Sequence, residues 1–262
     1  MRKLYKLVPP WLRYAFLFFS PPLVAQNDPV ILWEENFEGA ALNELYWNIA
    51  LGNGCPENCG WGNNERQYYT KDNYRIEDGL LFITAQKDGS TYTSSKITTK
   101  DKFQFRYGKI EIRAKLPSGH GVWPAFWLLG ANIDTVGWPL CGEIDIMEYV
   151  GKEPEMLMNA IHTQASYGNT VNTKKTLISG IDEGFHIFSA LWTPDRIDFF
   201  VDDVLRYSFS PPTKTEQTWP FDKPFYVILN MAIGGNLGGP QVDDTIFPQD
   251  FVIDYVRIFK NP

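Results

Sequence analysis

The sequence has few of the residues that build metal centres and disulfide frameworks. Its 262 residues include only three cysteines and three histidines. The histidines, His120, His162 and His186, lie in separate segments and lack the spacing of zinc ligands. The chain also has no internal repeat, low-complexity tract or linker. These absences favour one large domain, although the length alone would also allow two small ones.

Positive charge is scarce too. The chain has 24 Lys and Arg against 31 Asp and Glu, a net charge of −7. Four of the basic residues lie within the first 25 residues, which contain no acid, so the remainder carries about −11. An acidic surface argues against partners such as nucleic acid or anionic membranes. It would also repel sulfated polysaccharides, which favours a neutral glucan.

The sequence has no apolar run long enough to span a bilayer. Residues 1–25 combine a basic start with an apolar run from Ala15 to Ala25 that Pro21 and Pro22 interrupt. This pattern predicts a secretory signal peptide cleaved after Ala25, and hence a secreted protein, extracellular or periplasmic. No cysteine lies nearby, which argues against a lipid anchor. Residues 26–262 then form one domain, which we expect to be a monomer.

Helical periodicity is almost absent, whereas short alternating segments are frequent. Strands are predicted at 80–86, 108–115 and 225–233, among others, with turns such as Asp78-Gly79 between them. The pattern predicts an all-β protein, a β-sandwich jelly roll of two antiparallel sheets with a concave substrate cleft. Aromatic residues are plentiful, at 15% with nine Trp. We expect about half of the Trp residues in the core and others to stack on sugar rings.

One stretch, residues 142–149 (Gly-Glu-Ile-Asp-Ile-Met-Glu-Tyr), concentrates three carboxylates in a predicted strand. Alternation would place Glu143 and Asp145 on one face, and a β-bulge near Met147 would return Glu148 to that face. Cleavage of a glycosidic bond needs such a pair of carboxyl groups, one to attack the sugar and one to protonate the leaving oxygen. The alternative is a solvated acidic edge strand, but the interleaved apolar residues argue against it.

Here the sequence resembles glycoside hydrolase family 16, in its laminarinase-like form with one extra residue in the signature. Five further segments support the resemblance, in the same order along the chain: 61–65, 107–117, 123–130, 230–236 and 254–258. The resemblance implies a retaining endo-β-1,3-glucanase acting on laminarin-type β-glucan, with Glu143 as nucleophile, Glu148 as acid/base and Asp145 tuning Glu143. Such an enzyme is expected to need no cofactor for catalysis. Alternatives are a β-1,3-1,4-glucanase (lichenase), an agarase-type galactanase or a non-catalytic β-glucan-binding protein.

The resemblance also implies residues that bind the substrate. Asn63 would line the cleft, with a simple turn as the alternative. Glu111 and Arg113 share one face of a predicted strand and would contact sugar hydroxyls, with a cross-strand ion pair as the alternative. Asn230 would reach the cleft. The chain departs from the family at Leu237, where many members have Trp, so one stacking surface is expected to be missing.

Aromatic residues and a histidine flank the carboxylates. We expect Trp123 to stack on sugar, Trp127 to lie in the core and Trp138 to shape the subsite next to the scissile bond, the last by resemblance. His162 lies in the strand after the signature, beside the predicted acid/base, where it would hydrogen-bond a carboxylate or the substrate. A structural role is its alternative, and His186 is expected to be structural.

Two further sites are predicted. In the family a structural Ca²⁺ often lies on the convex face, and Asn36, Gly79 and Asp254 match its ligand positions. Cys55 and Cys59 lie four apart around a proline turn and are expected to form a disulfide, with a metal site as the alternative. Cys141 is then left over as a small buried residue.

Overall fold

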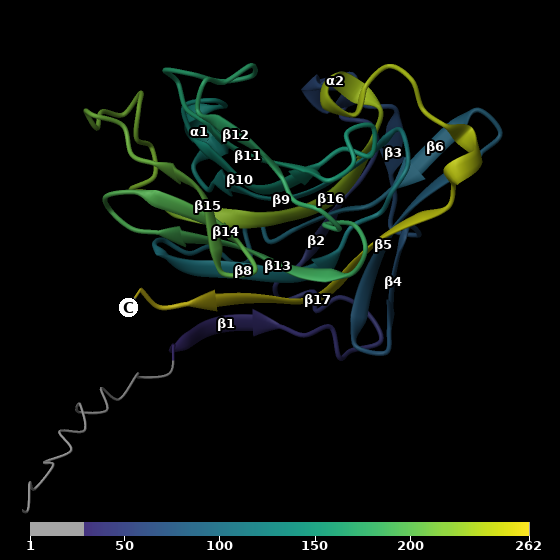
Figure 1. The fold of residues 1–262 in the computed structure, drawn as a ribbon, viewed down its shortest axis with the longest axis horizontal. Coiled ribbons are helices and arrows are strands. Elements are labelled where there is room, and N and C mark those ends of the chain that lie inside the picture. Colours follow the sequence, from purple (N-terminus) through teal and green to yellow (C-terminus); the bar gives the residue numbers. More distant parts are fainter. Residues whose placement is uncertain (1–28, 262) are drawn as a thin grey trace, which may run out of the picture.

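The computed structural model describes residues 29–261, so the predicted signal peptide lies outside the described residues. Within that range the chain forms two antiparallel sheets packed face to face, with four one-turn helices (Figure 1). This arrangement confirms the predicted all-β jelly-roll sandwich. No helix within residues 29–261 combines the length and apolar character that crossing a membrane requires.

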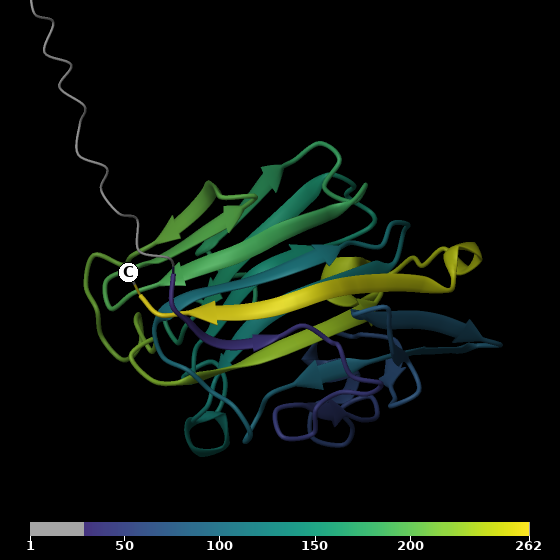
Figure 2. The same ribbon diagram turned by 90° about the horizontal axis from the view of Figure 1, so that it is seen from below.

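The larger sheet has ten strands, and β17 and β1 run side by side across it (Figure 2). Its main path is β15-β14-β13-β8-β17-β5-β6-β3, with β1 paired to β17 and β4 to β5. Only the β3–β6 pair is parallel among the described strands. The strands are β1 (Ile31–Glu35), β3 (Gln67–Tyr69), β4 (Tyr74–Glu77), β5 (Leu80–Asp88), β6 (Thr91–Ser94), β8 (Gly108–Lys115), β13 (Phe185–Trp192), β14 (Ile197–Val201), β15 (Val204–Phe209) and β17 (Gln249–Phe259).

The smaller sheet has seven strands in the order β12-β11-β10-β9-β16-β7-β2. They are β2 (Asn48–Ala50), β7 (Lys96–Thr98), β9 (Val122–Gly130), β10 (Glu143–Tyr149), β11 (Met156–His162), β12 (Thr173–Leu177) and β16 (Phe225–Ile233). The helices are η1 (Cys59–Gly62), α1 (Ile133–Val136), α2 (Gly235–Gly238) and η2 (Asp244–Ile246). Figure 1 places α1 and α2 beyond the seven-stranded sheet, on the side away from the ten-stranded one.

The core lies between the sheets and follows from the alternation of side chains along each strand. In β8 the inward residues Ile110, Ile112 and Ala114 are fully buried. In β16 every second residue from Val227 to Ile233 points inward. Burying each such aliphatic side chain contributes roughly 1.5–3 kcal/mol. The opposite face of the seven-stranded sheet, which we call its outer face, is therefore free to carry polar and aromatic groups.

The predicted β-bulge is present in β10. Its register with β9 shifts between Asp145 and Met147, and its register with β11 shifts between Asp145 and Glu148. Ile146 and Met147 consequently both point into the core. The buried side chain of Asn159 on β11 donates from Nδ2 to the Ile146 carbonyl oxygen, at 2.6 Å. This bond satisfies a backbone group that the bulge removes from the regular ladder.

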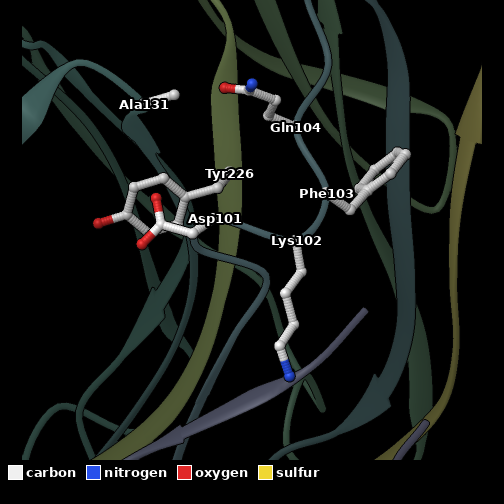
Figure 3. A pocket seen from close by; sticks show the side chains of 6 residues that line it. All are labelled: Asp101, Lys102, Phe103, Gln104, Ala131 and Tyr226. Carbon is white, nitrogen blue, oxygen red and sulfur yellow. The ribbon is translucent and has the colours of Figure 1, made fainter. Parts of the chain in front are cut away.

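Cys55 and Cys59 form a disulfide with an S–S distance of 2.04 Å, as expected, and Cys141 is free and buried. A pocket of about 70 Å³ contains none of the predicted catalytic carboxylates (Figure 3). It is lined by Asp101, Lys102, Phe103, Gln104, Ala131 and Tyr226.

The bulge generates a first prediction. Asn159→Ala should lower the free energy of unfolding by about 1–3 kcal/mol, because it leaves the Ile146 carbonyl buried without a donor. It should also lower activity, because Glu148 follows directly after the bulge. Urea denaturation and rate measurements test both effects. Asn159→Asp is the matched control that keeps the size but replaces the amide donor, so it should be at least as damaging. Unchanged stability in Asn159→Ala would contradict the assignment.

Candidate active site

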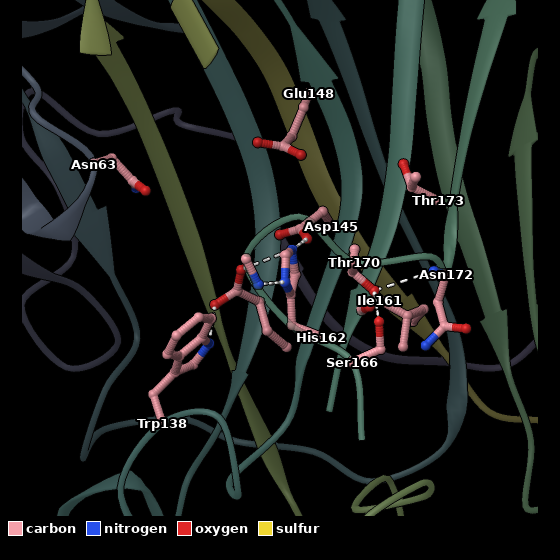
Figure 4. A network of polar contacts seen from close by, with 12 residues as sticks. Asn63, Trp138, Asp145, Glu148, Ile161, His162, Ser166, Thr170, Asn172 and Thr173 are labelled. Atoms are coloured by element: carbon pink, nitrogen blue, oxygen red, sulfur yellow. Dashed lines mark hydrogen bonds and ion pairs between the residues drawn. The ribbon is translucent and has the colours of Figure 1, made fainter. Parts of the chain in front are cut away.

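Three carboxylates meet on the outer face of the seven-stranded sheet. Glu143, Asp145 and Glu148 all project from β10, and the residues between them point into the core. Asp145 is 3% exposed and Glu148 is 8% exposed. In Figure 4 Glu148 lies above Asp145, with Asn63 and Thr173 on opposite sides of the site. Buried carboxylates are rarely left without partners, so their neighbours define the site.

Each glutamate is held by its own tryptophan. The indole Nε1–H of Trp138, in the loop before β10, donates to Oε2 of Glu143 at 3.0 Å. The indole of Trp123, on β9, donates to Oε1 of Glu148, also at 3.0 Å. An indole is a donor without an acceptor function, so both bonds place a glutamate oxygen at a fixed point. The structure thus places both predicted tryptophans against the carboxylates, Trp123 mostly buried and Trp138 at the surface.

His162 also lies at the carboxylates, but not where we expected it. The register of β10 and β11 pairs His162 with Glu143, whereas Glu148 pairs with Met158. The prediction that His162 lies beside the acid/base is therefore wrong. Because β10 and β11 are antiparallel, the end of β11, where His162 lies, is next to the start of β10, where Glu143 lies. Its Nε2 is 3.2 Å from Oδ2 of Asp145 and 3.6 Å from Oε1 of Glu143.

The surroundings separate the two glutamates electrostatically. Burial, reinforced by Asp145, raises the pKa of Glu143 to about 8, while the Trp138 hydrogen bond opposes the increase. Burial and the neighbouring Asp145 raise the pKa of Glu148 well above its usual range. Burial also raises the pKa of Asp145. Glu148 is therefore the glutamate that keeps its proton to the higher pH, and Glu143 is the first of the two to ionise as the pH rises.

Beside the carboxylates lies a polar network that the sequence did not reveal. Glu65 accepts hydrogen bonds from Asn63, Gln67 and the Tyr69 hydroxyl. Asn230 links Tyr69 to the next strand, because its amide donates to the Tyr69 oxygen and its Oδ1 accepts from the indole of Trp127. The structure thus brings Asn63 and Asn230 into one connected group on the outer face. The motif at 61–65 was the available signal for Glu65.

Trp127 and Lys96 extend this network. The ammonium of Lys96 lies 4.4 Å from the ring centre of Trp61 and 5.0 Å from that of Trp127. Both contacts are cation–π interactions. Trp127 shares the outer face with Trp123 and is only partly buried, so its assignment to the core is wrong. Side chains alternate along a strand, so positions 123, 125 and 127 share one face, and this pattern would have placed Trp127 on the face of Trp123. Nothing in the sequence pointed to Lys96.

Glu111 and Arg113 do not reach this site. They lie on β8 of the ten-stranded sheet and point away from the core, on the opposite side of the sandwich. Glu111 pairs with Lys109 and Arg113 pairs with Asp254. The prediction that they face the substrate is therefore wrong. Their alternation was correctly recognised, but alternation does not say to which sheet a strand belongs.

A second pocket borders Glu148. It is lined by Glu148, Val150, Glu153, Met156, Met158, Lys175 and Leu237. Leu237, one of these lining residues, packs against Trp123 and Val150. The position at which many family members have Trp therefore carries an aliphatic side chain here. It offers no aromatic stacking surface, as expected. A salt bridge between Lys175 and Glu153 adds a polar edge.

The three residues of the predicted calcium site lie around one part of β17. The carboxylate of Asp254 is paired with Arg113, and Asn36 Oδ1 accepts a hydrogen bond from Arg257. Gly79 lies in the turn between β4 and β5, and β5 pairs with β17 up to Ile253. Oxygen ligands of these kinds suit Ca²⁺. Calcium binding at these residues stays a prediction.

The comparisons with known proteins agree with this geometry. The family model "Glycosyl hydrolases family 16" matches residues 61–257. The chain therefore belongs to glycosyl hydrolase family 16 and is a glycoside hydrolase. The beta-glucanase of Rhodothermus marinus is 39% identical over an alignment of 249 positions, and the match covers 88% of this chain and 85% of that protein.

Solved structures extend the similarity to the fold. The laminarinase of Flavobacterium sp. UMI-01 is 61% identical and has a TM-score of 0.87, covering 88% of this chain and all of that one. The laminarinase catalytic domain of Thermotoga maritima MSB8 is 41% identical with a TM-score of 0.85, covering 90% of this chain and 99% of that one.

The buried carboxylates generate a second prediction. Because the pKa of Glu143 is about 8 in the folded protein, folded Glu143 keeps its proton between about pH 4.5 and 8, where an unfolded glutamate has lost it. The folded state then binds more protons, so the free energy of unfolding falls as pH rises through this window. The stabilisation is complete below about pH 4.5 and lost above about pH 8.

Urea denaturation at pH 5 and pH 8.5 tests this linkage. We expect Glu143→Gln to remove part of the pH dependence, about 4 kcal/mol, because an amide does not titrate. Glu216→Gln, at an exposed position, is the control and should leave the dependence unchanged. An identical pH dependence in Glu143→Gln and the wild type would contradict the assignment.

Proposed function

We propose that this chain is an exported, retaining endo-β-1,3-glucanase that hydrolyses laminarin-type β-glucans. The observation that carries the proposal is the set of three buried carboxylates on one bulged strand, with a separate indole holding each glutamate. The similarity to laminarinases over almost their whole length supports the choice of substrate. A polymeric glucan is the substrate partner that this proposal implies.

The reaction follows from the environments of the two glutamates. Glu143 attacks the anomeric carbon as the glycosidic bond breaks, and Glu148 gives its proton to the leaving oxygen. In the second step Glu148 takes a proton from water, the water oxygen attacks the anomeric carbon, and Glu143 leaves. Asp145 lies between them in the strand and, when ionised, raises the pKa of Glu148, which helps to keep the acid protonated. Two displacements at one carbon retain its configuration.

The outer face offers suitable contacts to a neutral sugar chain. Trp61 and Trp127 present ring surfaces, and Asn63, Glu65 and Lys96 present hydrogen-bonding groups beside them. The Lys96 ammonium has no hydrogen-bond or ion-pair partner among residues 29–261, so its N–H groups are available to sugar hydroxyls.

Export is part of the proposal for two reasons. A polysaccharide is too large to enter a cell intact, so an enzyme that cuts it internally acts outside. The Cys55–Cys59 disulfide also suits an oxidising compartment. The monomeric state and the structural Ca²⁺ at Asn36, Gly79 and Asp254 stay predictions, to be measured by light scattering and by the effect of chelators on thermal stability.

Product analysis tests the substrate. The protein is incubated in parallel with laminarin, mixed-linkage β-1,3-1,4-glucan and agarose, and the released sugars are separated by size. We expect short oligosaccharides of mixed length from laminarin, because an endo-acting enzyme cuts within the chain. Release from mixed-linkage glucan alone would identify a lichenase, and release from agarose alone a galactanase. Binding to laminarin without release would identify a glucan-binding protein. Each of these three outcomes would overturn the proposal.

Azide rescue tests the two glutamate roles separately. In Glu148→Ala the glycosyl-enzyme still forms with an activated aryl glycoside, and azide then replaces water, which gives a β-configured glycosyl azide. In Glu143→Ala azide attacks the substrate directly and gives the α-configured product. We expect both variants to lose at least about 10³-fold in kcat on laminarin without azide. Proton NMR distinguishes the products, and the opposite configurations would exchange the roles.

A further inference from the structure

His162 is in contact with two of the three carboxylates and with a backbone amide on its other side (Figure 4). We propose that His162 is a positioning residue for the nucleophile, held as the Nε2–H tautomer by the amide of Gly168. The segment 163–170, which follows β11, would thereby set the geometry of Glu143 and Asp145. This inference rests on the proposed function, because it takes Glu143 as the nucleophile.

The tautomer follows from the hydrogen bond on the far side of the ring. The backbone N–H of Gly168 donates to Nδ1 of His162, at 3.1 Å. A backbone N–H can only donate, so Nδ1 must present its lone pair. The neutral ring then carries its proton on Nε2. A doubly protonated ring would place two N–H groups against each other and lose this bond.

The proton on Nε2 faces the carboxylates. Nε2 lies 3.2 Å from Oδ2 of Asp145 and 3.6 Å from Oε1 of Glu143. Oδ2 of Asp145 is buried and accepts no hydrogen bond from the other residues in the described range 29–261. His162 is therefore the group available to satisfy this oxygen and to hold Asp145 and Glu143 at a fixed separation. The Glu143 carboxylate is then held at Oε2 by Trp138, while His162 faces its other oxygen at the longer distance of 3.6 Å.

The same bond argues against a metal site. Ligand atoms of Glu143, Asp145 and His162 lie within 4.8 Å of one another, close enough to surround a divalent cation. Binding a cation through Nε2 would require the ring proton to move to Nδ1. There it would face the Gly168 N–H and break the hydrogen bond that orients the ring. The amide thus favours a hydrogen-bond donor over a ligand at this position.

The segment 163–170 is built to hold the Gly168 amide in place. Thr163 and Ser166 exchange two backbone hydrogen bonds, at 2.9 and 3.0 Å. The hydroxyl of Thr170 contacts the Ser166 hydroxyl at 3.1 Å and donates to the Ile161 carbonyl at 2.9 Å. Gly168 itself adopts φ of +63°, which glycine tolerates best. These bonds connect the segment back to β11 directly before His162.

The segment also reaches Glu143 by a second route. The ring of Tyr167 meets the ring of Trp138 edge to face, with centroids 5.3 Å apart. Trp138 is the residue whose indole holds the other oxygen of Glu143. One short segment therefore supports the nucleophile both through His162 and through Trp138.

Two amide substitutions separate a positioning role from a merely structural one. In His162→Gln the longer side chain brings an amide N–H to about the position of Nε2, so donation to Asp145 survives. In His162→Asn the amide ends near the position of Nδ1 and does not reach the carboxylates. We expect His162→Gln to keep kcat on laminarin within about tenfold of the wild type, and His162→Asn to lose about 10²-fold or more with little change in KM. Thermal unfolding of both variants checks that they fold.

An activated substrate locates the defect. A dinitrophenyl β-laminaribioside needs no protonation of its leaving group, so Glu148→Ala should regain most of its first-step rate on it. His162→Asn should stay impaired, because its nucleophile is misplaced. The inference would be overturned if His162→Asn matched His162→Gln, or if the activated leaving group restored His162→Asn.

Nitrogen NMR of the wild type tests the tautomer independently of activity. The chain has three histidines, and His162→Gln identifies the signals of His162 by their loss. We expect the neutral Nε2–H pattern at the pH of activity. An Nδ1–H pattern or a doubly protonated ring would overturn the inference. A wild type that cleaves no glucan would contradict the proposed function instead, and the tautomer would still be decided by the spectra.

Discussion

The constraint on which this structure depends is that one strand must present three carboxylates to the same face with unequal spacing. Strict alternation accommodates Glu143 and Asp145 but sends Glu148 into the core. The bulge resolves the conflict by turning Ile146 and Met147 inward together. It leaves a backbone carbonyl without its ladder partner, and Asn159 on the neighbouring strand supplies the missing donor. The bulge and its partner strand therefore act as one unit.

The second constraint is the burial of those carboxylates. Removing them from water raises the pKa of each, and a cluster of this kind opposes folding at alkaline pH. The site offsets the burial with directed donors rather than with cations in direct contact, since indoles hold both glutamates and His162 faces Asp145. The large apolar core between the sheets provides the stability that such a site requires.

Most of the fold and the centre of the site were predictable from local sequence. The strands, the disulfide and the bulge all follow from patterns within a few residues, and so do the three carboxylates. The errors arose where the answer depends on which strands become neighbours. Glu111 and Arg113 share a face as expected but belong to the other sheet. His162 was placed beside the wrong glutamate because register is decided by the turn and the bulge together. Lys96 meets Trp61 and Trp127 only in three dimensions.

The pairing of each glutamate with an indole also gives the site its own optical reporters. Indole emission responds to a charge placed next to the ring, and in each step of the proposed reaction the charges of Glu143 and Glu148 change in opposite directions. Trp138 is 44% exposed whereas Trp123 is 8% exposed, so the two rings should emit at different wavelengths. Formation and hydrolysis of the glycosyl-enzyme would then be visible in real time, without a label, as two separate changes in tryptophan fluorescence.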